Sequence, residues 1–352
     1  MNTAAHLPLV ELTRGNLVES IHYGSVALAD IEGPVSVYGD GITPFFLRSS
    51  AKPFQALALL EHDGAKIFNL TLKEVAILCS SHSGTDEHVA VLQKLQKKIG
   101  IREKDLQCGI QPPLDKRTQE QLLLRGEKPT PLRHNCSGKH TGMLALAKIL
   151  GAPLESYLSP DHPVQQIILQ TISEMCSFPV GEIHLGIDGC SAPVFAIPLP
   201  NAAIGFARLA NGENLSRSRA NACRLICQAM SSHAEMVAGA GRFDTVFMKV
   251  MEGRAICKFG AEGYLGIGIP CRKGNPKTRG LGIAIKISDG DPENRAAPLA
   301  GLEVLYHLGL LKADDRSKLA DFDRRDLMNW GKLKVGVVRP SQGFSESFAH
   351  DG

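Results

Sequence analysis

A serine and a lysine three positions apart open the segment RSSAKPFQALALL, where Ser49 and Lys52 precede an apolar run typical of a helix. Residues i and i+3 share one face of a helix, so the Ser49 hydroxyl and the Lys52 amine come within reach of one proton. A neutral lysine can accept the proton of a serine hydroxyl, which then becomes a nucleophile. The spacing indicates acyl transfer, although a capping serine followed by a solvated lysine gives the same pattern.

Further segments break apolar stretches with small and polar residues. They are CSSHSGTDEH at 79–88, RHNCSGKHTG at 133–142, GIDGCSAP at 186–193, CKFGAEG at 257–263 and KISDGDPENR at 286–295. Glycine and serine let the backbone approach a ligand closely, so binding sites are often built at such breaks. Turn chemistry explains any one of them, but all of them together favour a functional site. For Asp289 and Asp291, capping of the following helix is the preferred interpretation.

Length and composition favour a soluble globular protein. The chain has 352 residues, of which 43% are hydrophobic, and a formal net charge of +3 with lysines and arginines scattered among acids. This distribution does not favour nucleic-acid binding. The N-terminus lacks the pattern of an export signal, and no segment is apolar for long enough to span a bilayer. Since the nine cysteines form no C-x-x-C pair, we expect reduced thiols in the cytoplasm.

The order of the expected elements favours an α+β fold in a single domain over residues 1–352. The N-terminal segment is rich in Val, Ile and Tyr, which predicts strands in a hairpin or meander. Helical periodicity dominates from about 49 to 180, and strands return, with helices between them, from about 181 to 340. Residues 341–352 are polar and are expected to form a loose tail.

Strands at both ends of the chain predict one mainly antiparallel sheet, built from residues 1–48 and about 181–340, with the helical lobe inserted between them. The cleft between the two lobes is the natural place for a site. A parallel βαβ sheet is the competing interpretation. It is disfavoured because the strands are not regularly spaced and no glycine-rich phosphate-binding motif follows one of them.

Taken in order, the motifs resemble those of a known enzyme family. RSSAKPFQ, CSSHSG, RHNCSGKHTGM, DGCSAPVFAIPL, KFGAEG and AIKISDGD are similar to motifs of the bacterial asparaginases typified by the inducible, thermolabile enzyme of Rhizobium. The resemblance extends from about Glu11 to Pro340. It implies hydrolysis of L-asparagine to L-aspartate and ammonia, and a fold similar to serine β-lactamases and β-lactamase-like glutaminases. It also implies a homodimer and two Ser-Lys pairs beside a metal site.

The resemblance assigns four catalytic residues. Its first Ser-Lys pair falls on Ser49 and Lys52, and its second on Ser81 of CSSHSG and Lys258 of CKFGAEG. Ser80 stands where the family has alanine, which adds a hydroxyl beside the pair. Because two lysines in one pocket lower each other's pKa, we expect one neutral and one charged lysine, in either order. Ser49 is the preferred nucleophile.

The resemblance also implies that Zn2+ is bound by Cys136, Lys139 and Cys190. A cysteine thiolate is a strong zinc ligand, whereas lysine is unusual and must lose its proton to bind. Without the resemblance, two separate cysteines are better interpreted as small buried hydrophobic residues. Zinc has two conceivable roles here, in the chemistry itself or in shaping the pocket, and the sequence leaves both open.

An amino-acid substrate carries a carboxylate and an ammonium group that a buried site must neutralise. We expect Arg48 to bind the carboxylate, although a surface ion pair is an equally good interpretation. Asp188 is expected to hold a zinc-bound water or the amino group of the substrate. Asn135 and His140 flank the proposed ligands and are expected to orient them or to contact the substrate.

Alternative functions stay open at this point. A glutaminase substrate differs from asparagine by one methylene, which is worth only about 1–3 kcal/mol in a pocket. Another β-lactamase-like Ser-Lys hydrolase shares the Ser-Lys start, but such enzymes generally act outside the cytoplasm. A non-catalytic sensor of amino acids or metals keeps the pocket without turnover, and the presence of both Ser-Lys pairs disfavours it.

Overall fold

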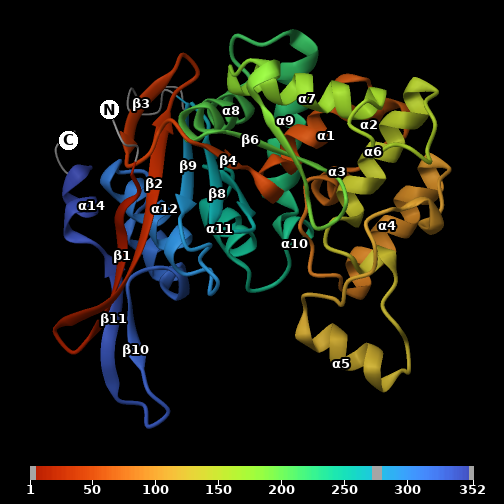
Figure 1. The fold of residues 1–352 in the computed structure, drawn as a ribbon. Helices are drawn as coiled ribbons and strands as arrows, with labels where there is room; N and C mark the ends of the chain where they lie inside the picture. Colours follow the sequence, from red (N-terminus) through yellow and green to blue (C-terminus); the bar gives the residue numbers. More distant parts are fainter. Residues whose placement is uncertain (1–4, 272–279, 349–352) are drawn as a thin grey trace.

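The computed structural model describes residues 5–271 and 280–348, and most of its strands join one antiparallel sheet (Figure 1). The strand order is β10-β11-β1-β2-β9-β8-β7, and β3 pairs with β2 outside this path. A second, three-stranded sheet has the order β4-β6-β5. The strands are β1 (Leu7–Arg14), β2 (Leu17–Ala29), β3 (Pro34–Tyr38), β4 (Pro44–Phe46), β5 (His184–Ile187), β6 (Pro193–Pro198), β7 (Ile256–Gly260), β8 (Tyr264–Ile269), β9 (Leu281–Ile287), β10 (Arg325–Met328) and β11 (Lys334–Pro340).

Helices fill the chain between these strands. They are α1 (Lys52–Glu61), α2 (Gly64–Ile67), α3 (Leu72–Leu78), α4 (Asp86–Ile99), α5 (Lys116–Leu124), α6 (Ser137–Leu150), α7 (Pro163–Cys176), α8 (Leu199–Asn211), α9 (Arg217–Ser232), α10 (Ala234–Val237), α11 (Phe243–Met251), α12 (Ala296–His307), α13 (Ala313–Lys318) and α14 (Gln342–Ser347). Short 3-10 turns are η1 (Arg48–Ala51), η2 (Glu103–Asp105), η3 (Pro131–Arg133), η4 (Val180–Glu182) and η5 (Ala320–Phe322). Helices α1 to α7 gather on one side of the molecule and form the helical lobe (Figure 1).

Helices α8 and α12 cover opposite faces of the large sheet. Side chains alternate between the two faces along a strand, so neighbouring residues of β8 meet different helices. A Cβ on Gly266 would lie 1.9 Å from the ring of Phe206 in α8, which explains why this position is glycine. On the other face, Leu265 and Ile267 lie close to Gly301 of α12. Strands β8 and β9 are therefore a buried layer between helices.

Helix α1 lies at the centre of the helical lobe. It packs against α6, α7 and α9, and its residues from Lys52 to Leu60 are buried. A helix that is apolar on nearly all sides belongs in a core rather than on a surface. The turn η1 directly precedes α1 and packs on β7, where Ser50 Oγ donates to the carbonyl oxygen of Lys258 at 3.0 Å. The start of α1 is thereby fixed against the edge strand of the large sheet.

The expected α+β class is confirmed, because strands from both ends of the chain form one antiparallel sheet around an inserted helical region.

The expected loose tail over residues 341–352 is wrong for 342–347, which form α14. Phe344 of this helix is fully buried and packs against Tyr38, so one apolar residue docks an otherwise polar segment. Residues 349–352 lie outside the described residues. In the part of the chain that the structure describes, no helix has the length and apolarity to cross a membrane.

Candidate active site

The centre of the site is a hydrogen bond between Lys52 and Ser81. Lys52 Nζ donates to Ser81 Oγ at 2.9 Å and to the carbonyl oxygen of Asn135 at 3.4 Å. Lys52 begins α1 and Ser81 follows the end of α3, so two neighbouring helix ends hold the pair. The Lys52 side chain is buried. Burial, followed by the charges of Lys139 and Lys258, lowers the pKa of Lys52 to about 8.

Ser49 lies one turn before Lys52, in η1. It is half-buried, and among residues 5–271 and 280–348 its hydroxyl has no hydrogen-bond partner. The preceding residue, Arg48, has a left-handed backbone with φ 49°, which is uncommon for a residue with a side chain and indicates a locally constrained turn. The serine that is hydrogen-bonded to Lys52 is thus Ser81, whereas the sequence spacing predicted Ser49.

Lys258 forms an ion pair with Asp244, a residue that the sequence analysis did not identify. Lys258 Nζ lies 2.9 Å from Asp244 Oδ2, and the two side chains are 0% and 1% exposed. Asp244 Oδ1 also accepts the backbone N–H of Phe259 at 2.9 Å. One carboxylate therefore fixes both the lysine side chain and the outer edge of β7 to the first turn of α11. In this arrangement Lys258 contacts Asp244 rather than the predicted partner Ser81.

The serines of the CSSHSG segment have different partners. Ser80 Oγ donates to the carbonyl oxygen of Ile77 at 2.7 Å, within the last turn of α3. Ser83 Oγ donates to the carbonyl oxygen of Ala238 at 2.8 Å. Because these hydroxyls are satisfied by the backbone, Ser81 is the serine of this segment that is available to a lysine. The extra hydroxyl of Ser80 does not compete with it.

His82 holds the CSSHSG segment against the start of α6. Its Nε2 lies 2.8 Å from Ser137 Oγ, and its Nδ1 accepts the backbone N–H of Gly84 at 3.1 Å. The ring therefore carries its proton on Nε2. Burial, followed by the neighbouring His88, lowers the pKa of His82 well below its ordinary value, so the imidazole is neutral. The histidine positions Ser81 without adding a charge.

Cys136, Lys139 and Cys190 lie together at the N-terminal end of α6. All of them are buried, and Lys139 Nζ lies 2.9 Å from Cys190 Sγ. The hydrogen bond with Cys190, followed by the charges of Lys52 and Lys139, lowers the pKa of Cys136 well below its ordinary value. Burial alone would lower the pKa of Lys139, but Cys136 and Cys190 raise it above its ordinary value. These shifts favour the charged forms of Cys136 and Lys139, whereas the pKa of Cys190 is raised by its hydrogen bond with Cys136 and by burial.

The donor chemistry of this cluster fits a zinc ion. Two sulfur atoms and an amine nitrogen come together, and Asp188 Oδ2 lies 3.9 Å from Cys190 Sγ and 4.0 Å from Lys139 Nζ. His140 Nε2 is buried without a hydrogen-bond partner among the described residues. Within the described ranges, no group of three or more His, Cys, Asp and Glu could hold a metal ion. A metal at this place consequently depends on Lys139, which must lose its proton to bind.

Arg48 is already occupied by protein carboxylates. Its Nε and Nη2 lie 3.0 Å and 2.9 Å from Asp188 Oδ1, and its Nη1 lies 3.9 Å from Glu262 Oε1. The ion-pair role that the sequence left open for Arg48 is thus present in the structure. Asp188 in turn connects Arg48 to the cluster of Cys190 and Lys139.

Asn135 and His140 differ in their access to the site. Asn135 is half-buried, its carbonyl oxygen accepts from Lys52, and its side-chain amide has no hydrogen-bond partner among the described residues. His140 is fully buried, and its Nδ1 lies 2.5 Å from the hydroxyl of Tyr157. Burial, followed by the charge of Lys139, lowers the pKa of His140 well below its ordinary value. Asn135 therefore lies beside the reacting groups, and His140 lies within the helical lobe.

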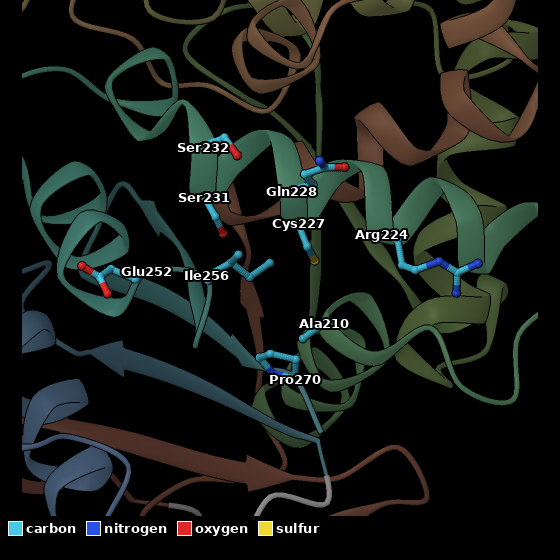
Figure 2. A pocket seen from close by; sticks show the side chains of 10 residues that line it. Ala210, Arg224, Cys227, Gln228, Ser231, Ser232, Glu252, Ile256 and Pro270 are labelled. Atoms are coloured by element: carbon cyan, nitrogen blue, oxygen red, sulfur yellow. The ribbon is translucent and has the colours of Figure 1, made fainter. Parts of the chain in front are cut away.

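Two cavities differ in their relation to these residues. One, of about 240 Å3, adjoins the Lys258–Asp244 pair and is lined by Gly241, Arg242, Phe243, Asp244, Phe259, Glu293, Asn294 and Phe322. The other, of about 400 Å3, is lined by α9 side chains and by neighbouring residues (Figure 2), namely Ala210, Arg224, Cys227, Gln228, Ser231, Ser232, Glu252, Gly253, Ile256 and Pro270. None of the residues predicted from the sequence lines the second cavity. The first cavity is not lined by those residues either, but it includes Asp244, so it meets the candidate active site at the ion pair with Lys258.

Comparisons with known proteins give a family and distant structural neighbours. The family model of L-asparaginase II matches residues 10–340. No curated protein matches the sequence significantly. Among solved structures, native Mglu in 4.3 M NaCl is 14% identical with a TM-score of 0.42, and the match covers 85% of this chain and 61% of Mglu.

A probable glutaminase from Bacillus subtilis, complexed with 6-diazo-5-oxo-L-norleucine, is 12% identical with a TM-score of 0.39, and the match covers 81% of this chain and 82% of the glutaminase. The chain spans less than two thirds of the length of Mglu in the first of these structures. Since both TM-scores are below 0.5, the assignment below is based on the family and on the geometry of the site.

Proposed function

The chain belongs to the L-asparaginase II family, and from this premise we propose that it hydrolyses L-asparagine to L-aspartate and ammonia. Family membership supports an amidohydrolase that acts on a small molecule. The observation that carries the proposal is the buried hydrogen bond from Lys52 to Ser81, next to the Lys258–Asp244 ion pair. A neutral base, hydroxyl groups and a fixed positive charge are what amide hydrolysis through an acyl-enzyme requires.

In the proposed mechanism Lys52 is the base and Lys258 is the charged lysine. A pKa of about 8 leaves part of Lys52 neutral at pH 7, whereas the ion pair with Asp244 stabilises Lys258 as an ammonium group. Ser49 is the proposed nucleophile because its hydroxyl is half-buried and free of hydrogen bonds to the described residues. Ser81, which is hydrogen-bonded to Lys52, carries the proton onward.

Two chemical steps would convert L-asparagine into L-aspartate and ammonia. Ser49 Oγ bonds to the side-chain carbonyl carbon of asparagine while its proton passes to Lys52. The bond between that carbon and the amide nitrogen then breaks, and the nitrogen takes up the proton and leaves as ammonia. Water attacks the aspartyl ester, which releases L-aspartate and returns the proton to Ser49. The covalent aspartyl-enzyme divides one difficult hydrolysis into two easier reactions.

Zinc, the homodimer and the cytoplasmic location are also parts of this proposal. Cys136, Lys139 and Cys190 would hold the metal, and bound Zn2+ would supply a Lewis acid. The support is the buried cluster of two cysteines and a lysine described above. Metal analysis of the purified protein tests the first point, with one zinc per chain expected and loss of zinc expected for Cys136→Ser. Light scattering, which measures the molar mass of the protein in solution, tests the homodimer.

Ammonia release from L-asparagine tests the proposed function. We expect turnover by the unmodified protein, and a fall in kcat of at least about 1000-fold for Ser49→Ala, because serine nucleophiles contribute at least this much in comparable enzymes. Ser218→Ala, on the exposed face of α9, is the matched control and should keep full activity. Full turnover by folded Ser49→Ala would remove Ser49 from the mechanism. Faster turnover of L-glutamine would assign the protein to glutaminases instead.

A further inference from the structure

The segment 237–242, which leads from α10 into α11, holds both backbone groups of Ser81. The N–H of Ser81 donates to the carbonyl oxygen of Val237 at 2.8 Å, and the carbonyl oxygen of Ser81 accepts from Nη1 of Arg242. Ser81 is buried and belongs to no helix or strand. Its backbone groups therefore find their partners in this neighbouring segment rather than in secondary structure of their own.

The segment 237–242 is shaped to lie against the CSSHSG residues. Gly239 has a φ of 134°, a conformation that residues with a side chain rarely adopt, and a Cβ at this position would lie 2.3 Å from Ser83 Oγ. The N–H of Gly239 donates to Thr245 Oγ1 at 3.1 Å, which ties the segment to α11. Close contact between the two segments thus requires glycine at 239.

The same part of the chain also holds Lys258. Arg242 directly precedes α11, and Asp244 lies in the first turn of that helix. Arg242 contacts the backbone of Ser81, and Asp244 pairs with Lys258 at 2.9 Å. Since Ser81 is hydrogen-bonded to Lys52, the start of α11 connects the Lys52–Ser81 pair to the second lysine. The connection between Ser81 and Lys258 that the resemblance implies runs through positions 242 and 244 in this structure.

We propose that Arg242 is a positioning residue, which keeps the Ser81 hydroxyl on Lys52 by holding the backbone of Ser81. The inference rests on the proposed function, in which Ser81 carries the proton from Lys52 onward. Arg242 bonds to the carbonyl oxygen of Ser81 and not to its hydroxyl, so a change of Arg242 leaves every reacting group in place chemically but displaces one of them. A displacement of about 1 Å lowers a rate by up to about 100-fold.

The kinetics of Arg242→Gln test the positioning role. On L-asparagine we expect kcat to fall about 10- to 100-fold and KM to change less than about threefold, because the interaction that is lost orients a reacting group and does not bind the substrate. Arg242→Lys keeps a cationic N–H donor and should recover part of the lost kcat. Arg217→Gln removes the same charge from an exposed position on α9 and should behave as the unmodified protein. A rise in KM at unchanged kcat would overturn the inference.

A double-mutant cycle shows whether Arg242 acts through Ser81. Ser81→Ala removes the hydroxyl that Arg242 is proposed to position. In this background Arg242→Gln should lower kcat by less than about a further twofold, because no hydroxyl is left to orient. A purely structural effect of Arg242 lowers activity by the same factor in both backgrounds. The same 10- to 100-fold loss with and without the Ser81 hydroxyl would therefore contradict the positioning role.

Amide hydrogen exchange keeps this inference distinct from the proposed function, because it requires no turnover. In Arg242→Gln we expect the amides of residues 79–85 to exchange at least about tenfold faster than in the unmodified protein, and those of β1 and β2, across the large sheet, to stay unchanged. Equal exchange of 79–85 in both proteins would overturn the inference even if asparagine is hydrolysed. Absence of ammonia release from the unmodified protein, with exchange of 79–85 that depends on Arg242, would overturn the hydrolysis and support the positioning of Ser81.

A second variant covers the case in which Arg242→Gln does not fold. Arg242→Lys then takes its place in the exchange measurement. We expect a smaller increase in exchange that is confined to residues 79–85 and to the segment 237–242. An increase spread over the whole protein would mean that Arg242 supports the fold in general, and would overturn its assignment as a positioning residue for Ser81.

Discussion

At the scale of single residues, charged side chains of the site meet partners from other secondary-structure elements. Lys258 lies against Asp244 and Arg48 against Asp188, and these pairs are largely or fully buried. A buried charge is costly unless it is paired, so these contacts determine which groups stay charged. Lys52 lacks a carboxylate partner in the described residues and is therefore the lysine best suited to lose its proton.

The pH dependence of activity follows from Lys52. Its pKa of about 8 means that Lys52 is protonated and inactive as a base below this pH, and neutral above it. We expect kcat/KM on L-asparagine to rise about tenfold per pH unit below pH 8 and to level off above it. Lys52→Arg stays protonated throughout and should lose about 100- to 10,000-fold. A profile that is flat from about pH 6 to 10 would exclude Lys52 as the base.

At the scale of secondary structure, the sequence predicted the helices better than their contacts. Helical periodicity was predicted from about 49 to 180, and α1, α3, α4, α6 and α7 lie in this range, because their apolar residues recur at helical spacing. Strand β8 contains Gly266 and Gly268, which in a sequence are typical of a turn, whereas in the structure they let α8 approach the sheet closely. Asp244 was missed because its role arises only when α11 packs on β7, 14 residues from Lys258.

The packing of α11 on β7 gives a prediction at this scale. Asp244→Asn keeps the shape of the side chain but leaves Lys258 as a buried charge without a carboxylate. We expect about 3–5 kcal/mol less stability towards unfolding by urea, together with a large loss of activity. Asp326→Asn is the matched control, because Asp326 forms a surface ion pair with Lys334 and both are about half exposed. The control should lose less than about 1 kcal/mol.

Two other results are informative for Asp244. Asp244→Glu keeps the carboxylate and should recover part of the activity, since the charge on Lys258 is again paired. If Asp244→Asn were as active as the unmodified protein, the charge state of Lys258 could not depend on this ion pair, and the proposed division of roles between the two lysines would be wrong.

At the scale of the whole molecule, the two ends of the chain meet at one side of the sheet. Strand β1 pairs with both β2 and β11, and α14 packs against β1. The candidate site lies at β7, at the opposite end of the strand order, with β2, β9 and β8 between. The strands expected at both ends of the sequence predicted that the two ends of the chain pair in one sheet. The polar composition of the last segment concealed α14, because two apolar side chains, Phe344 and Phe348, are too weak a pattern to predict a docked helix.

This separation predicts that stability and activity can be changed independently. Phe344 is fully buried between Tyr38 and Phe348, so Phe344→Ala should lower the free energy of unfolding by about 3–5 kcal/mol. Phe348 is only half-buried, and Phe348→Ala should cost less than half of that. Both are measured by urea denaturation. Helix α14 packs on β1, and strands β2, β9 and β8 separate β1 from β7. We therefore expect kcat/KM per folded molecule to stay unchanged at urea concentrations well below the unfolding midpoint. A fall in kcat/KM without a change in stability would mean that the C-terminal helix acts on the site itself.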